Sequence, residues 1–377
     1  MNNFIFPITT ANFETNWKIA NSVFLKSEKK YTAFRIASFF CNTIFTFLSV
    51  LAVNGLLHDH STVQFRLFLE GIPLLIPLWE RWRSLVLSST QSFGVQLGAT
   101  ALSLYIACFV IGGIISLLVM LFYRSDSKEL PVDSRKENAA KLLALAKDAR
   151  YHSNRIRSVN HPFYALFFVA FQLILLSLYS IIEIGSAAKL IDICTAPIMQ
   201  GLVPLIHTEL TYISIQTAIF VPSLIIFTLL LYLSYSFALM LLSVCLQPFY
   251  YCNVPYRFVA EAEHHYVFAD TNFEGMSDEE IKAVVASQAE SHFQQAMVLE
   301  ASESYKKAKD YFALAAHGGN AAGMEHYARH WLITRAKDPA KYWLQKCVAS
   351  GNASKTAKKM LRRLSWHRKV SVRYIKK

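Results

Sequence analysis

The sequence predicts an all-α, polytopic membrane protein with about four transmembrane helices and a C-terminal cytoplasmic α-helical repeat domain. Two observations lead to this fold class. Four long stretches between residues 36 and 256 contain no Asp, Glu, Lys or Arg, and a stretch near the C-terminus repeats itself. The chain is 54% hydrophobic and only 17% charged, whereas soluble domains carry about 25% charged residues. This composition favours a protein that lies largely in a membrane.

The uncharged stretches define the expected spans. They cover residues 36–57, 84–123, 158–182 and 210–256. A helix needs about 20 consecutive apolar residues to cross a bilayer, so each stretch is long enough. We therefore expect a membrane domain over 35–256, with spans at about 35–57, 98–123, 161–184 and 213–240.

The basic residues predict the orientation of the spans. Cytoplasmic loops are enriched in Lys and Arg, and the 124–160 loop alone holds nine of them. Four spans place this loop on the same side as the N-tail (1–34) and the C-terminal region. We therefore expect a multi-pass protein of the inner (cytoplasmic) membrane with both termini in the cytoplasm. Residues 65–79 and 196–206 are apolar but short and contain prolines, so they are expected to be interfacial or re-entrant.

A helical pattern recurs near the C-terminus. The stretch from Ala308 to Gly319 is echoed from Ala340 to Gly351, a shift of 32 residues. A fixed period of this length is typical of stacked helix pairs, in which glycine ends a helix and small residues allow close approach. The shift also aligns Ser291 with the small residue Gly323.

The start of this module carries a helix signal. Ser277-Asp278-Glu279-Glu280 is a capping box, in which serine and glutamate side chains satisfy free backbone N–H groups. We expect a helix from there to about residue 300, a linker over 257–276, a repeat module over 277–366 and a basic tail over 367–377. Because two repeats are few for a stable stack, the 277–300 helix or a helix at 136–150 is expected to cover it.

The two copies share a spaced set of residues, Ala308-x-x-Tyr311-Phe312-x-x-Ala315-Ala316-x-x-Gly319-Asn320 and Ala340-x-x-Trp343-Leu344-x-x-Cys347-Val348-x-x-Gly351-Asn352. With this pattern, residues 290–360 resemble the Sel-one-like repeats, which are relatives of the tetratricopeptide repeats. The resemblance implies an adaptor surface that assembles other proteins, often in bacterial membrane or secretion-related settings.

We therefore expect an integral membrane scaffold or adaptor, forming homo- or hetero-oligomers, whose repeat module binds one or more other proteins. The candidate contact residues are Tyr327, Arg329, Trp331 and Lys337, although Tyr327 and Trp331 could equally belong to the core. One alternative is a structural subunit of a bacterial secretion, conjugation or envelope-assembly complex. The other is a small-solute transporter or channel, for which the uncharged second and fourth stretches give no positive sign.

The C-terminal end is strongly basic and indicates a second partner. Basic residues near a bilayer attract anionic lipid with about 1 kcal/mol each, and membrane lipid is the nearest such partner for a membrane protein. A solvated tail and nucleic acid are the alternatives, but no nucleic-acid-binding fold accompanies the charge. The candidate lipid-contacting residues are Lys358, Lys359, Arg362, Arg363, Arg368 and Lys369.

The sequence contains no motif for catalysis or for a cofactor, such as a phosphate loop or a nucleophile elbow. His264 and His265 follow two glutamates, but adjacent side chains diverge and chelate poorly. His326 and His330 share a helical face without a carboxylate at ligand spacing. We therefore expect no enzyme activity, no cofactor and no metal-binding residue.

Overall fold

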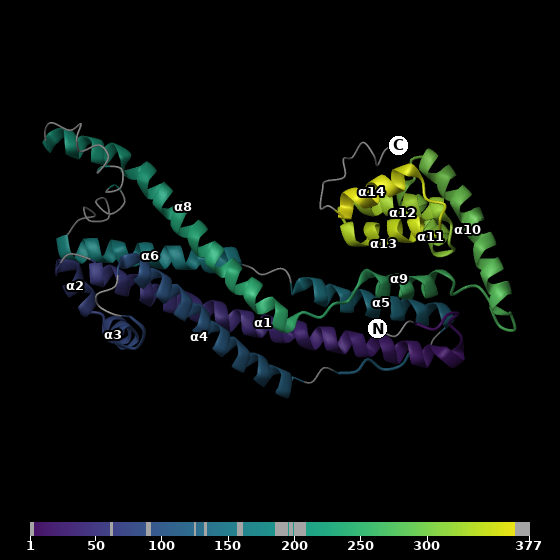
Figure 1. Ribbon diagram of the computed structural model, residues 1–377, viewed down its shortest axis with the longest axis horizontal. Coiled ribbons are helices and arrows are strands. Elements are labelled where there is room, and N and C mark those ends of the chain that lie inside the picture. The colour runs from purple at the N-terminus through teal and green to yellow at the C-terminus, as the bar shows by residue number, and fades with distance from the viewer. Residues whose placement is uncertain are drawn as a thin grey trace. The chain divides into compact units, whose positions relative to one another are not determined.

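The computed structural model describes residues 4–60, 63–87, 92–123, 126–131, 134–156, 161–184, 195, 199 and 209–365. Every regular element in these residues is a helix (Figure 1), which confirms the predicted all-α class. The helices are α1 (Thr10–His60), α2 (Val63–Glu70), α3 (Leu75–Val86), α4 (Phe93–Phe122), α5 (Arg135–Arg155), α6 (His161–Ile184), α8 (Glu209–Tyr250), α9 (Tyr256–Val267), α10 (Asp278–Ala301), α11 (Tyr305–His317), α12 (Ala321–Ile333), α13 (Lys337–Ala349) and α14 (Lys355–Ser365).

The chain folds into two compact units. The first, here called the three-segment unit, comprises Met1–Glu28, Ser125–Ser153 and Cys252–Lys377. The second, the apolar unit, comprises Lys29–Arg124 and Asn154–Tyr251. Each unit therefore contains segments that are far apart in the sequence, so their cores bring together residues that no local pattern connects.

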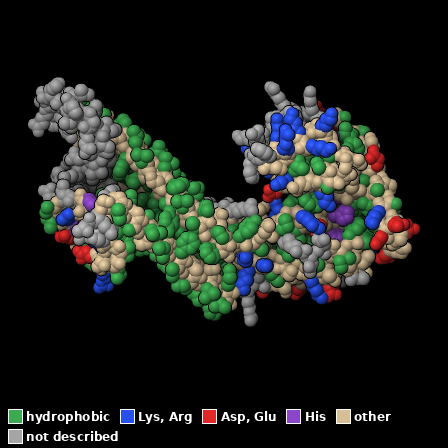
Figure 2. All heavy atoms as spheres, viewed as in Figure 1, with side chains coloured by type: hydrophobic (Ala, Val, Ile, Leu, Met, Phe, Trp, Pro, Cys, Tyr) green, Lys and Arg blue, Asp and Glu red, His purple; other side chains and the backbone are tan. Residues whose placement is uncertain are grey.

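Three helices in the described residues are long and apolar enough to cross a membrane. They are Asn12–His60, Gly94–Phe122 and Ala218–Tyr250. Hydrophobic side chains cover the visible faces of α4 and α8 (Figure 2), as expected for helices that contact lipid. The remaining predicted span, 161–184, coincides with α6. The apolar stretch of α6, Phe163–Leu175, is shorter than those three helices.

The first long helix starts well before the predicted span at 35–57. Residues 1–34 were expected to be a tail, but α1 begins at Thr10. Phe13, Trp17, Ala20 and Phe24 lie at helical spacing and are buried in the core of the three-segment unit. Packing of this apolar face explains why the N-terminal segment is helical.

The segment 65–79 forms parts of two short helices, α2 and α3, rather than one span. Trp79 of α3 is buried and lies directly against Gly55 of α1, where a methyl group would overlap its ring. Glycine at residue 55 therefore allows α3 to approach α1. The other segment expected to be interfacial or re-entrant, 196–206, lies outside the described residues apart from Met199.

A single hydrophobic core joins the three segments of the three-segment unit. It includes Trp17 of α1, Leu145 of α5, Phe258 of α9, Phe312 of α11 and Leu344 of α13, all of them buried. Because these side chains exclude water together, the N-terminal segment, the α5 segment and the C-terminal helices fold as one body.

The stretch 257–276, expected to be a linker, contains helix α9 (Tyr256–Val267). Phe258, Val259, Ala262 and His265 are buried at helical spacing. The helix contacts α11 and α13, so these residues belong to the core of the unit. Residues 256–267 therefore form a packed helix where a linker was predicted. The apolar face of α9 is explained by its contacts with α11 and α13, which are distant in the sequence.

The capping box at the start of α10 is confirmed. The Ser277 hydroxyl accepts a hydrogen bond from the backbone N–H of Glu280, and the Glu280 carboxylate accepts one from the backbone N–H of Ser277. The helix runs from Asp278 to Ala301, close to the expected end at residue 300. From here α10 to α14 pack in sequence, each on the next, as Figure 1 shows.

Candidate functional site

The backbone of the C-terminal helices repeats with the 32-residue shift seen in the sequence. Helices α11 and α13 both contain 13 residues. Left-handed backbone conformations precede them at Glu303 (φ 60°) and Arg335 (φ 61°), and follow them at Gly319 (φ 96°) and Gly351 (φ 82°). The predicted helix-ending role of the two glycines is therefore confirmed, and the turns before α11 and α13 match as well.

Small residues bring neighbouring helices of this array together. A methyl group on Gly323 at the start of α12 would lie 2.7 Å from the Cβ of Ala315 on α11. A methyl group on Gly318 would overlap Ala289 of α10. The expectation that a small residue at position 323 permits close approach is confirmed.

The four residues predicted to contact a partner differ in their exposure. Tyr327 is only 2% exposed, so it belongs to the core, as the alternative interpretation allowed. Arg329 is mostly covered and forms an ion pair with Glu325 at 2.5 Å. Trp331 is half-buried beneath Lys309, whose Nζ lies 4.1 Å from the ring centroid. Lys337 is exposed.

Helix α14 separates its apolar and basic residues. Ala357, Met360 and Leu364 are buried, whereas Lys358, Lys359 and Arg362 are exposed and Arg363 is half-buried. Figure 2 shows Lys and Arg side chains gathered on the face over α14. Arg368 and Lys369 lie outside the described residues. The described candidate lipid-contacting residues thus share a helix whose other face is held in the core.

One carboxylate of the three-segment unit, Glu263 on α9, is mostly covered, with 16% of its side chain exposed. It accepts hydrogen bonds from the hydroxyl groups of Tyr327 (3.1 Å) and Tyr256 (3.3 Å). The Nε2 atom of His317 lies 3.2 Å from its Oε2 atom, and Trp343 donates to the Tyr256 hydroxyl at 3.4 Å. One carboxylate therefore connects α9 to α11 and α12, and through Tyr256 to α13.

The surroundings of Glu263 favour its charged form. Burial alone would raise the pKa of this carboxyl group, but the hydrogen bond and charge of His317, with Lys147 and Tyr327, lower it below its usual value. Burial raises the pKa of the Tyr327 and Tyr256 hydroxyl groups, and the charge on Glu263 raises it further. Both tyrosines therefore remain protonated donors to an ionised carboxylate.

A cavity of about 320 Å³ lies beside this network, between the N-terminal segment and helices α9, α11 and α13. We call it the histidine cavity. Burial lowers the pKa of His264 to about 2 and of His265 to about 4, with neighbouring His317 adding to both shifts. These imidazoles are therefore neutral at pH 7. The residues that matter for its chemistry are Phe6, His264, His265, His317, Trp343 and Lys346.

No local pattern in the sequence indicates this cavity. His264 and His265 lie in the stretch predicted to be a linker, and Phe6 lies in the predicted N-tail. The helical spacing of Phe258, Ala262 and His265 was the available signal, because it predicts a helix with one buried face. The approach of the N-terminal segment has no local signal at all.

His326 and His330 do have a carboxylate partner, which comes from another helix. Glu300 of α10 lies 3.2 Å from Nδ1 of His326 and 3.8 Å from Nε2 of His330. Sequence spacing within α12 could not reveal it. Among the described residues, no three or more His, Cys, Asp or Glu side chains are arranged to hold a metal ion.

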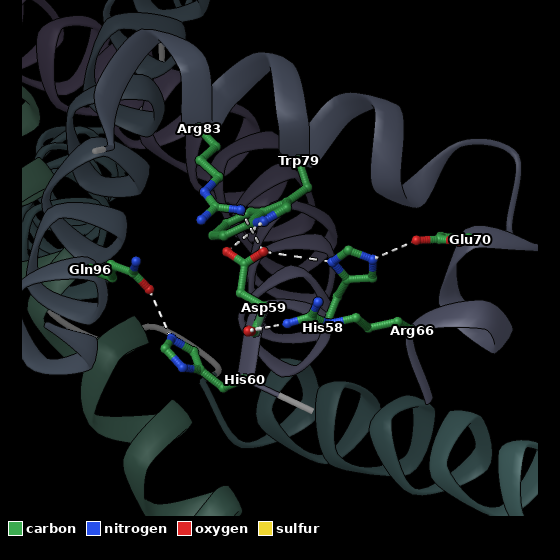
Figure 3. A network of polar contacts seen from close by, with 8 residues as sticks. All are labelled: His58, Asp59, His60, Arg66, Glu70, Trp79, Arg83 and Gln96. Carbon is green, nitrogen blue, oxygen red and sulfur yellow. Dashed lines mark hydrogen bonds and ion pairs between the residues drawn. The ribbon is translucent and has the colours of Figure 1, made fainter. Parts of the chain in front are cut away.

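The apolar unit contains a second polar network, at the C-terminal end of α1 (Figure 3). Asp59 is buried, accepts a hydrogen bond from Trp79 at 3.2 Å and pairs with Arg83 at 2.8 Å. Arg66 donates to the backbone carbonyls of His58 and Asp59 at 3.0 Å. These contacts attach α2 and α3 to the end of α1. The guanidinium group of Arg66 also satisfies backbone carbonyls that have no partner within α1 at its C-terminal end.

No protein-family model, curated protein or solved structure matches the chain.

Proposed function

We propose that the chain is an integral membrane scaffold whose C-terminal helices form a repeat module that binds other proteins. The observation that carries this proposal is the matched backbone of the two helix pairs. Left-handed residues recur at Glu303 and Arg335, and again at Gly319 and Gly351. Repeated helix pairs present an extended surface built from equivalent positions, a design typical of protein-binding modules. We assign the module to the Sel-one-like type.

We also propose four spans rather than three. Residues 126–153 and 252–365 share one hydrophobic core, so both segments lie on the same side of a membrane. The chain between them must then cross an even number of times. Helix α8 supplies one crossing, and α6 supplies the other, because its 24 residues extend about 36 Å against a hydrocarbon core of about 30 Å.

The same reasoning applies to the N-terminal half. Residues 4–28 and 126–153 also share that core, so α1 and α4 cross as a pair while α2 and α3 stay at one surface. With the nine basic residues of the 124–160 loop, the positive-inside rule assigns the three-segment unit and both termini to the cytoplasmic side. Single-cysteine variants test this orientation. Lys128→Cys and Lys307→Cys should then react with an impermeant thiol reagent only after the inner membrane is opened. Arg66→Cys should react before the membrane is opened.

One exposed candidate contact residue provides the test of the scaffold function. Lys337 is exposed at the start of α13. In a crosslinked pull-down from mild detergent, Lys337→Glu should lose a specific partner. Lys282→Glu, an exposed charge reversal on α10, is the matched control and should retain it. Retention of the partner by both variants would contradict a binding surface on α13.

Point variants are required because a chain truncated after Tyr256 would not test the module alone. Removal of the C-terminal helices would expose Phe13, Trp17 and Leu145, which share their core. Loss of a partner would then report unfolding of the whole three-segment unit. Charge reversal at an exposed lysine changes the surface and leaves this core intact.

We propose that α14 contacts anionic lipid through Lys358, Lys359 and Arg362. Its opposite face is anchored by Met360 and Leu364, so the basic side chains extend from a fixed helix. Reversal of Lys358 and Arg362 to Glu should weaken co-sedimentation of the detergent-solubilised chain with phosphatidylserine vesicles, and salt should weaken it in the parent protein. Binding that is unchanged by reversal would leave α14 a solvated basic face.

A second candidate function, a subunit of a secretion, conjugation or envelope-assembly complex, is favoured by one feature of α4. Gly94 and Gly98 are exposed at a spacing of four residues, and neither would contact another atom within 4 Å if it carried a methyl group. Small residues at this spacing allow close packing of membrane helices. Partners that survive Lys337→Glu but are lost in Gly98→Leu would favour this function.

A further inference from the structure

The histidine cavity has the size of a small-molecule site. Its volume is about 320 Å³, and ligand sites in proteins range from about 300 to 1,000 Å³. It is lined within one unit, by the N-terminal segment and by α9, α11, α12 and α13. The elements around it share one hydrophobic core, so its walls are held by packing.

Aromatic rings form much of the wall. Phe6 lies 4.3 Å from the ring of His264, and Trp343 lies 4.7 Å from the ring of His317 in an edge-on arrangement. Phe4 and Tyr342 also line the cavity. Rings at these distances offer flat and edge contacts to another aromatic ring, so the walls suit a planar aromatic molecule.

Two charged side chains line the cavity, the cation Lys346 and the carboxylate Glu261. Lys346 lines the cavity and is exposed, and its described contact is with the ring of Tyr342 at 5.8 Å, with no ion pair to a described residue. The acidic residue on the lining, Glu261, is already paired with Arg257 at 2.7 Å. The ammonium group of Lys346 is therefore available to an anion.

We propose that the histidine cavity binds a planar aromatic carboxylate, with its ring against Phe6 and Trp343 and its carboxylate at Lys346. The ligand is of the size of benzoate, phenylacetate or indole-3-acetate. This site does not depend on the scaffold function, because it is built from the interior of the unit rather than from its partner-binding surface.

Isothermal titration of the full chain in detergent micelles tests the site with three indole probes. Indole-3-acetate is the anion, indole-3-acetamide the neutral analogue and tryptamine the cation. Indole-3-acetate should bind with a Kd below about 1 mM, at least tenfold more tightly than the amide, and tryptamine should bind more weakly still. Equal binding of acid and amide would overturn the proposed role of charge.

Variants locate the binding. Lys346→Met should weaken indole-3-acetate at least tenfold and leave the amide unchanged, while Lys346→Arg should retain binding. Lys341→Met, an exposed lysine on the same helix that does not line the cavity, is the matched control and should bind like the parent. No saturable binding of benzoate, phenylacetate or indole-3-acetate, or binding insensitive to Lys346→Met, would overturn the proposal.

Discussion

The hydroxyl group of Tyr327 on α12 donates a hydrogen bond to the carboxylate of Glu263 on α9 over 3.1 Å, across 64 residues of sequence. Glu263 also lies 3.2 Å from His317 on α11. Helices α11 and α12 are thereby attached to α9 by a polar network in addition to the hydrophobic core. Such a network is favourable when each member is satisfied and costly when one is removed.

Tyr327→Phe should therefore destabilise the three-segment unit. The change removes one hydrogen bond to a charged group while it retains the ring, so we expect a loss of about 1–3 kcal/mol in the free energy of unfolding. Chemical denaturation of the detergent-solubilised chain measures it. Tyr305→Phe, at a tyrosine that is 55% exposed, should have no measurable effect. Equal stability of the two variants would show that the Glu263 bond contributes nothing.

The unit should lose stability as pH falls below about 6.5. Burial lowers the pKa of His264 to about 2 and of His265 to about 4, while the unfolded histidines titrate near 6.5. Below pH 6.5 the unfolded chain binds protons that the folded chain does not, so the unfolding free energy decreases towards pH 4 for His265 and pH 2 for His264. At pH 5 each histidine contributes a loss of about 2 kcal/mol.

Denaturant midpoints between pH 7.5 and 5.0 measure this effect. In this range the carboxyl group of Glu263, whose pKa is held below its usual value by His317, stays ionised and does not add to the pH dependence. His265→Phe should reduce the pH dependence, because this buried histidine no longer titrates, while His264, His152, His326 and His330, whose pKa burial also lowers, keep the remainder. A slope as steep as that of the parent would assign the acid sensitivity to other groups.

Gly319→Ala and Gly351→Ala should destabilise the chain by similar amounts. Both glycines have left-handed backbone conformations, and neither has another atom near the site of a methyl group. The cost is therefore that of the backbone alone, about 1–2 kcal/mol for an L-residue with positive φ. Thermal unfolding of each variant checks the equivalence of the two positions.

The reverse substitutions provide the control for this pair. Glu303→Gly and Arg335→Gly replace residues with φ of 60° and 61°, so they should leave stability unchanged or raise it. Destabilisation by both would show that these side chains, rather than the backbone turns, hold the helix pairs.

Asp59→Asn should loosen the attachment of α3 to α1. Asp59 is buried and pairs with Arg83 at 2.8 Å, so the change leaves Arg83 without its partner. Removal of one member of a buried pair typically costs about 3–5 kcal/mol, and the 30% exposure of the Arg83 side chain reduces this to about 1–3 kcal/mol.

A double-mutant cycle with Arg83→Leu measures the coupling. The double variant should be less destabilised than the sum of the single variants, because the unpaired charge is removed with its partner. Additive effects would show that Trp79 and Gly55, which pack directly together, hold α3 without the ion pair.

The amino-acid sequence by itself determined the all-helical class, three of the four predicted spans, the start of α10 and the glycine ends of α11 and α13. These features depend on local quantities, namely apolar length, capping side chains and backbone freedom at Gly319 and Gly351. Each can be read from a few neighbouring residues.

Only the tertiary structure decided that residues 4–28 and α5 belong with the C-terminal helices, that α9 replaces a linker, and that Glu263, His317 and Tyr327 meet. It also placed Tyr327 in the core and paired His326 with Glu300. The physical reason is that burial and buried hydrogen bonds depend on residues far apart in the chain, whose approach has no signature in local composition or spacing.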